Sequence, residues 1–129
     1  YMTLVPNVDA DGNELGGIRT PDVAVPLGTY AGWNPRGAAI GASNHLARWA
    51  GSFFPFAKTE DERRSGGDPR PSVETRYPSQ RVYVDRVREA AERLKAEGFL
   101  LPEDADAFVQ RAERGEWPPS APGTVRTPR

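Results

Sequence analysis

The chain has 129 residues, of which only 24 are Leu, Ile, Val or Phe, so little material is available for a hydrophobic core. Gly and Pro contribute 13 residues each, and this share predicts that turns and loops make up much of the structure. The 17 basic and 18 acidic residues leave a net charge of −1, which excludes a basic nucleic-acid-binding protein. No apolar run approaches the roughly 20 residues that cross a bilayer, so we expect no membrane span.

Cysteine is absent and His45 is the single histidine, so the sequence offers no ligand set for zinc, and we expect neither a metal nor a cofactor. The chain starts with Tyr1 followed by Met2, without the basic and apolar regions of a signal peptide. We expect it to be a segment of a longer protein, and its compartment and oligomeric state stay open.

Residues 1–58 carry 4 acidic and 4 basic residues and are predicted to be extended and loop-rich, with short strands. The Asp, Gly and Asn residues of 9–14 predict a turn that follows a short strand. Two prolines within 15–30 exclude a long central strand, so this stretch is expected to run extended. A loop followed by one or two helical turns is expected at 43–49.

Residues 59–116 carry 14 acidic and 11 basic residues and are predicted to be helical. The spacing of Thr59 and Glu62 is that of a capping box and predicts a short helix from about 60 to 65. Ser72 can cap a further helical turn.

Two longer helices are predicted by the apolar periodicity that follows. The first begins after Ser79 as N-cap and ends before Gly98, and the second begins at Pro102 and ends at about Arg114. A short apolar link joins them, which predicts an antiparallel helical hairpin. The apolar stripes are Tyr83, Val87, Ala90, Ala91 and Leu94 on the first helix, and Ala105, Phe108, Val109 and Ala112 on the second.

These stripes are too small to close a core with each other alone, since four of their nine residues are alanine. A further body has to cover them, in part from aromatic residues elsewhere and in part from a partner segment. The Pro-rich residues 117–129 are expected to form a flexible tail. The candidate aromatic residues are Trp33, Trp49, Phe53, Phe54 and Phe56.

The turn at 9–14 contains oxygen ligands of the kind that calcium prefers. An EF-hand loop starting at Asp9 would need Gly where Glu14 stands and Glu where Thr20 stands. A solvated turn therefore fits the residues better than a metal site.

His45 could serve as a general base only with a nucleophile and a carboxylate beside it. Ser43 lies two residues away, a spacing that does not bring two side chains together on a helix, and no Gly-x-Ser-x-Gly elbow occurs in the chain. We therefore assign no catalytic residue.

Four arginines lie near one another in the chain, at Arg63, Arg64, Arg70 and Arg76. Guanidinium groups can bind a phosphate or carboxylate ligand, but acidic residues occupy the same stretch, and pairing with them is the favoured interpretation.

A second cluster combines aromatic, amide and guanidinium side chains. Tyr30, Trp33, Asn34 and Arg36 could line a substrate cleft or an interface, because flat apolar surface with a few polar groups is typical of binding sites. The same residues could also form a buried corner.

Several motifs in a fixed order resemble a known family. The chain is similar, over about residues 4–114, to the C-terminal portion of the bacterial "alpha/beta hydrolase domain" family. The motifs are VPNVDADGNE at 5–14, GIRTP at 17–21, VAVPL at 23–27, TYAGWN at 29–34, GSFFPFA at 51–57, GDPRPS at 67–72 and LLPED at 100–104.

The resemblance implies a parent protein with an α/β-hydrolase fold, whose sheet, nucleophilic Ser and triad His lie upstream of Tyr1. None of the matched motifs is catalytic, so no triad residue is carried over, and His45 does not inherit that role. The implied partner of the chain is the N-terminal catalytic body of the parent.

The fold expected is a mixed α+β fragment, with an extended N-terminal half and a C-terminal helical hairpin. Residues 1–116 would be the C-terminal segment of a hydrolase that cleaves ester-type bonds and would be inactive alone. The alternative hypothesis is a non-catalytic accessory or protein-interaction module. A Gly-x-Ser-x-Gly motif upstream would favour the first hypothesis.

Overall fold

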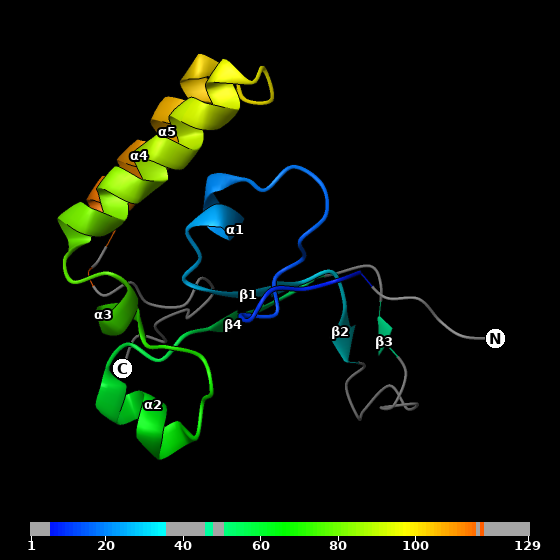
Figure 1. Ribbon diagram of the computed structural model, residues 1–129, viewed down its shortest axis with the longest axis vertical. Helices are drawn as coiled ribbons and strands as arrows, with labels where there is room; N and C mark the ends of the chain where they lie inside the picture. Colours follow the sequence, from blue (N-terminus) through cyan, green and yellow to red (C-terminus); the bar gives the residue numbers. More distant parts are fainter. Residues whose placement is uncertain (1–5, 36–45, 48–50, 116, 118–129) are drawn as a thin grey trace, which may run out of the picture.

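The computed structural model describes residues 6–35, 46–47, 51–115 and 117. Figure 1 shows a pair of long helices at one end, a short helix at the other end, and two small sheets between them. The elements are α1 Pro21–Ala24, β1 Gly28–Ala31, β2 Asn34–Pro35, β3 Leu46–Ala47, β4 Ser52–Pro55, α2 Glu60–Gly66, α3 Val73–Arg76, α4 Gln80–Ala96 and α5 Pro102–Arg114.

The larger sheet is an antiparallel pair of β1 and β4, in which Tyr30 lies opposite Phe53. The pair begins at Gly28, where a Cβ atom would lie 2.5 Å from the carbonyl oxygen of Phe54. Such a distance is far below van der Waals contact, so the close approach of the two strands requires glycine at this position.

A second antiparallel pair joins β2 to β3, with Asn34 opposite Ala47. The prediction of helical turns at 43–49 is wrong for Leu46 and Ala47, which are in extended conformation because their backbone pairs with β2. The remaining residues of that prediction lie outside the described ranges.

The sequence predicts an extended conformation for residues 15–30, and this prediction is wrong for residues 21–24. Residues Pro21–Ala24 form the short helix α1, with Pro21 at its first position and Asp22 in its first turn. Proline has no amide hydrogen to leave unpaired at a helix start and its φ angle suits the helix, so Pro21 begins a helix here rather than interrupting a strand.

The turn at 9–14 is confirmed. Val8 and Glu14 form an isolated antiparallel bridge, and Gly12 has a φ of 80°. One carboxylate oxygen of Asp9 accepts hydrogen bonds from the backbone N–H groups of Asp11 and Asn13, at 2.9 and 3.0 Å. These local hydrogen bonds give the backbone N–H groups on the inner side of the turn their acceptors.

The caps of α2 and α3 are those predicted. The hydroxyl of Thr59 accepts from the N–H of Glu62 at 3.2 Å, and the carboxylate of Glu62 accepts in turn from the N–H of Lys58. Ser72 is fully buried and accepts from the N–H of Thr75 at 3.3 Å. Each cap satisfies an amide that the helix itself leaves unpaired.

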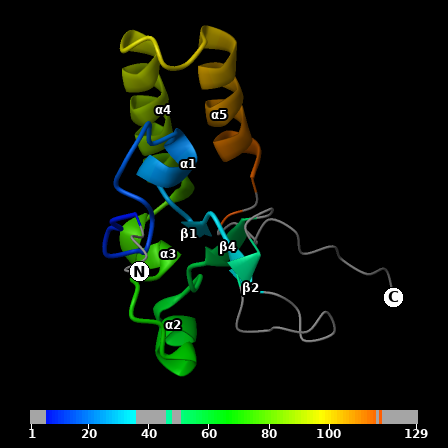
Figure 2. The ribbon, with the colours of Figure 1, turned by 90° about the vertical axis from the view of Figure 1, so that its right-hand side faces the viewer.

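Helices α4 and α5 begin and end where the sequence predicts. Ser79 caps α4, and Gly98, with a φ of 80°, follows its last turn. The N–H of Phe99 donates to the carbonyl of Leu94 and that of Gly98 to the carbonyl of Lys95, which is the Schellman pattern. Figure 2 shows the two helices side by side, with α1 packed near them.

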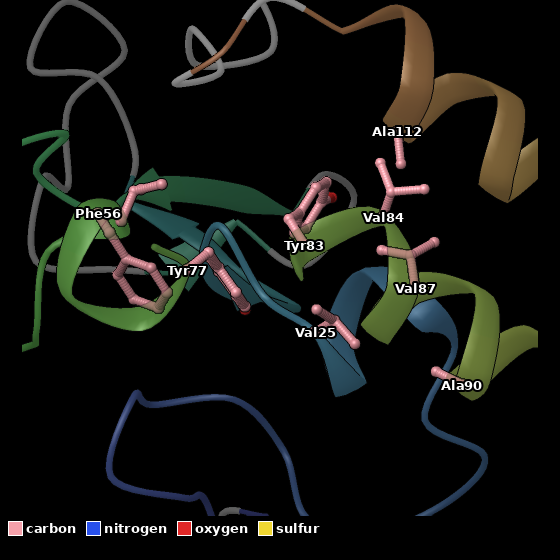
Figure 3. Packing of buried hydrophobic residues seen from close by; sticks show 9 residues of the cluster. Val25, Phe56, Tyr77, Tyr83, Val84, Val87, Ala90 and Ala112 are labelled. Atoms are coloured by element: carbon pink, nitrogen blue, oxygen red, sulfur yellow. The ribbon is translucent and has the colours of Figure 1, made fainter. Parts of the chain in front are cut away.

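The core lies where α4 meets α1, α3, α5 and the end of β4 (Figure 3). Most of the predicted α4 stripe is part of it, together with Val84, which the stripe had omitted. Its buried members are Val25, Phe56, Val73, Tyr77, Tyr83, Val84, Val87, Ala90 and Ala112, with Ala24, Leu27, Phe108, Val109 and Trp117 partly buried against them.

The aromatic residues proposed as cover for the helices differ in burial. Phe56 is buried in the core and Phe53 is half-buried, whereas Phe54 and Trp33 are exposed, and Trp49 lies outside the described residues. Trp117, which the sequence analysis assigned to the tail, packs instead against Tyr83 with ring centroids 5.4 Å apart. The described residues thus have a mixed fold of helices and short antiparallel sheets, and they bury a core of their own.

Candidate functional site

The structure describes three of the four predicted site residues. Tyr30 lies on β1, Trp33 lies between β1 and β2, and Asn34 begins β2. Trp33 and Asn34 are exposed, while Tyr30 is half-buried. Arg36 lies outside the described residues, so the structure does not test its predicted position beside the other three.

The Tyr30 side chain is held by an aromatic ring of the neighbouring strand. Its ring packs against Phe53 with centroids 4.8 Å apart and an interplanar angle of 50°, a tilted aromatic pair. Burial, with a smaller contribution from the charge of Asp22 and against the opposing effect of Arg111, raises the pKa of Tyr30 to about 12. The phenol is therefore neutral at physiological pH and can donate a hydrogen bond or offer its ring, but it cannot act as a base.

A hollow of about 300 Å³ lies beside Tyr30. Glu14, Ile18 and Gly32 are among the residues that form it, and we call it the Tyr30 hollow. Ile18 is 56% exposed, and Leu15 and Trp33, which adjoin the lining residues in the chain, are 46% and 43% exposed. Apolar side chains thus surround a hollow that also has one carboxylate, that of Glu14, and one guanidinium, that of Arg19.

Asn13 fixes the position of the turn against β1, and the sequence analysis missed this role. Its side chain is fully buried, its amide donates to the carbonyl of Gly28 at 3.2 Å, and its carbonyl oxygen accepts the N–H of Tyr30 at 2.8 Å. Both bonds reach the unpaired backbone edge of β1. An Asn in a turn is usually explained by local bonds, so its sequence position gave no signal of this contact.

The arginines of α2 and of the loop that follows it are paired within the chain, as the favoured interpretation stated. Arg63 and Arg64 contact Glu60, and Arg70 contacts Asp68 at 2.6 Å. Hydrogen bonds from the Arg70 side chain hold the pKa of Asp68 below its usual value. These guanidinium groups are therefore committed to structure.

Arg76 also pairs internally, but with a distant partner. Both of its terminal nitrogens contact the carboxylate of Asp11, and its guanidinium lies 4.1 Å from the ring centroid of Phe56. Arg70 contacts the same ring from 5.0 Å and donates to the hydroxyl of Thr29 at 2.8 Å. The turn, β1 and α3 are thereby joined around one aromatic ring.

The family model described as "Alpha/beta hydrolase domain" matches residues 2–110. The chain belongs to this family. No curated protein and no solved structure gave a significant match. The turn, the Tyr30 hollow and the arginine pairs described above all lie within the residues that the family model matches.

The structure does not describe the two residues that the sequence analysis considered as a nucleophile and a general base. His45 and Ser43 lie outside the described residues. The part of the chain that the structure describes holds no group of three or more Asp, Glu, His or Cys residues able to bind a metal ion. No helix within the same ranges is long and apolar enough to cross a membrane.

Proposed function

We propose that the chain is the C-terminal segment of an α/β hydrolase that cleaves ester-type bonds, and that it packs against a catalytic body which carries the nucleophile. The observation that carries this proposal is the exposed apolar surface around the Tyr30 hollow in a chain of the hydrolase family. In this assignment Tyr30, Trp33, Asn34 and Arg36 line the edge of the substrate cleft or the interface with the body.

The chemistry of the Tyr30 hollow supports a binding role over a catalytic one. Tyr30 is a neutral phenol whose pKa is raised rather than lowered, as a base would need, and Glu14 is an exposed carboxylate without a histidine among the described residues. Apolar surface next to one or two polar groups is suited to positioning a substrate or a neighbouring surface. Bond cleavage would then use a nucleophile and base from the catalytic body.

The rigidity of the hollow supports the same role. Asn13 holds the turn to β1 by two hydrogen bonds, and the tilted ring pair of Tyr30 and Phe53 fixes the strand beneath it. A surface that is ordered before contact loses less conformational entropy when a partner covers it. The Tyr30 hollow is thus prepared for a fixed contact.

A second exposed apolar pair favours the alternative, an interaction module. Phe99 and Leu101, in the link between α4 and α5, are 58% and 60% exposed. This link lies at the far end of the helix pair from the two sheets, as Figure 1 shows. A non-catalytic partner contact at the link would be independent of the Tyr30 hollow.

The proposal is tested by ester hydrolysis. The 129-residue chain alone is expected not to turn over p-nitrophenyl esters, whereas the full-length hydrolase is expected to do so. Ile18→Asp in the full-length protein should lower kcat/KM at least about tenfold, because it places a charge in an apolar contact. Arg81→Gln on the exposed face of α4 is the matched control and should leave activity unchanged.

Two results would contradict the proposal. Turnover by the isolated chain that is lost on Ser43→Ala would place the nucleophile within it. Full activity of Ile18→Asp would separate the Tyr30 hollow from catalysis, and the same measurement on Leu101→Asp would then show whether the link between α4 and α5 carries the contact.

A further inference from the structure

A cleft of about 490 Å³ lies between the turn at 9–14, α1 and α4. It shares Arg19 with the Tyr30 hollow but is otherwise lined by different residues, and its volume is within the range of small-molecule sites. Pro26 and Tyr77 supply apolar surface to it. The charged residues that line it are Asp9, Asp11, Arg19, Arg76, Arg86 and Arg93.

The two carboxylates of the cleft are already neutralised. Asp9 accepts from the Arg19 guanidinium at 2.7 Å through one oxygen and from two backbone N–H groups through the other. Asp11 is contacted by both terminal nitrogens of Arg76. Neither carboxylate is therefore available to balance a further cation.

Arg86 and Arg93 form no ion pair with any described residue, so the cleft has a surplus of two positive charges. They stand seven residues apart on α4, which places them on one face, about 10 Å apart along the axis. Arg86 lies over the ring of Tyr77 at 5.4 Å from its centroid, which restricts its guanidinium without using its hydrogens.

The Arg19 side chain also lines the cleft, and one of its donors is unpaired. Its Nε atom is buried and has no hydrogen-bond partner within the described chain. The same side chain lines the cleft and is held in place by Asp9.

We propose that this cleft binds a small dianionic oxyanion, a phosphate group or a dicarboxylate, between Arg86 and Arg93, with Arg19 as a further donor. Two guanidinium groups without carboxylate partners match two negative charges, and guanidinium is suited to the planar and tetrahedral oxyanions. Tyr77 and Pro26 offer an apolar wall for the carbon part of an organic ligand. The proposal does not depend on ester hydrolysis.

The test is a titration of the ¹⁵N-labelled 129-residue chain, following the Nε–H signals of its arginines. Inorganic phosphate, phenyl phosphate and succinate are the probes, and sodium chloride at equal ionic strength is the control for screening. We expect saturable shifts of Arg86 and Arg93 with at least one dianion and none with chloride. Preference among the three probes distinguishes phosphate, phosphate ester and dicarboxylate.

Three variants make the test specific. Arg86→Gln and Arg93→Gln should each weaken binding about tenfold or more, whereas Arg81→Gln should leave it unchanged. Arg81 is on the same helix with its side chain 91% exposed, and it does not line the cleft. An equal effect of all three variants, or shifts that chloride reproduces, would overturn the proposal.

A second measurement uses the chemistry of the side chains directly. Phenylglyoxal modification mapped by peptide mass spectrometry should show that the bound dianion protects Arg86 and Arg93 but leaves Arg81 reactive. This readout applies equally to the full-length protein. Uniform modification of the three arginines in saturating phosphate and succinate would overturn the proposal.

Discussion

Arg76 and Asp11, 65 residues apart in the chain, form a two-pronged ion pair between α3 and the turn at 9–14. Each side chain is only 16% exposed, so the pair is partly shielded from water. It connects the N-terminal turn to the helical half beside the ring of Phe56, at the edge of a small core. Charge here replaces part of the contact that a larger hydrophobic core would provide.

Removing the guanidinium group of Arg76 is expected to destabilise the folded chain. Arg76→Gln leaves the Asp11 carboxylate without its partner and removes the guanidinium from the ring of Phe56, so the free energy of unfolding should fall by about 1.5–3 kcal/mol. Urea denaturation measures it, with Arg81→Gln as a control. A double-mutant cycle with Asp11→Asn that gave no coupling energy would contradict the assignment.

Asn13→Ala is expected to loosen the turn from β1. The variant leaves the Gly28 carbonyl and the Tyr30 N–H without their partners, which should cost about 1–3 kcal/mol of stability. Hydrogen exchange should show the Tyr30 amide losing its protection, while amides in α4 change only with global stability. Unchanged protection at Tyr30 would refute the anchoring role of Asn13.

Gly28→Ala tests the close approach of the two strands. A Cβ atom there would lie 2.5 Å from the Phe54 carbonyl oxygen and 2.7 Å from Cε2 of Phe53, so we expect a loss of about 1–3 kcal/mol. Gly66→Ala in α2 is the matched control, because nothing lies within 4 Å of the added atom. It should be neutral or more stable by up to about 1 kcal/mol. Equal unfolding midpoints for the two variants would argue against the strand contact.

The buried tyrosines predict an alkaline loss of stability. Burial raises the pKa of Tyr30 and of Tyr77 to about 12, above the value of about 10 in an unfolded chain. Because the unfolded state ionises first, the stabilisation is complete below about pH 10 and is lost as the pH rises through the folded pKa. Urea midpoints measured across this pH range report the loss of stability, and the absorbance of tyrosinate reports the ionisation of the phenols. Tyr30→Phe should reduce the slope, and a flat profile would contradict the burial of the two phenols.

The features that the sequence predicts correctly are those set by neighbouring residues. Thr59, Ser72 and Ser79 cap the helices that follow them because a hydroxyl needs only the amide two or three residues ahead. Gly98 ends α4 for an equally local reason, its positive φ angle. The apolar stripe of α4 is likewise a property of one helix.

The contacts that the sequence does not predict join distant residues. Arg76 has acidic neighbours in its own stretch, yet it pairs with Asp11, and Asn13 bonds to Gly28 rather than within its turn. Trp117 lies two residues after Gly115 and directly before two prolines, a tail-like context, but it packs on Tyr83. Such long-range pairings depend on which surfaces meet after folding, and a single sequence carries little information about which surfaces these are.

The core of this chain also has a thermal consequence. Its buried members are chiefly valine, alanine and tyrosine, so unfolding exposes less aliphatic surface than it would in a leucine-rich domain. Since exposed apolar surface dominates the heat capacity change, we expect a ΔCp below the usual ~12–15 cal/mol/K per residue. The curve of stability against temperature should then have little curvature, with little weakening in the cold.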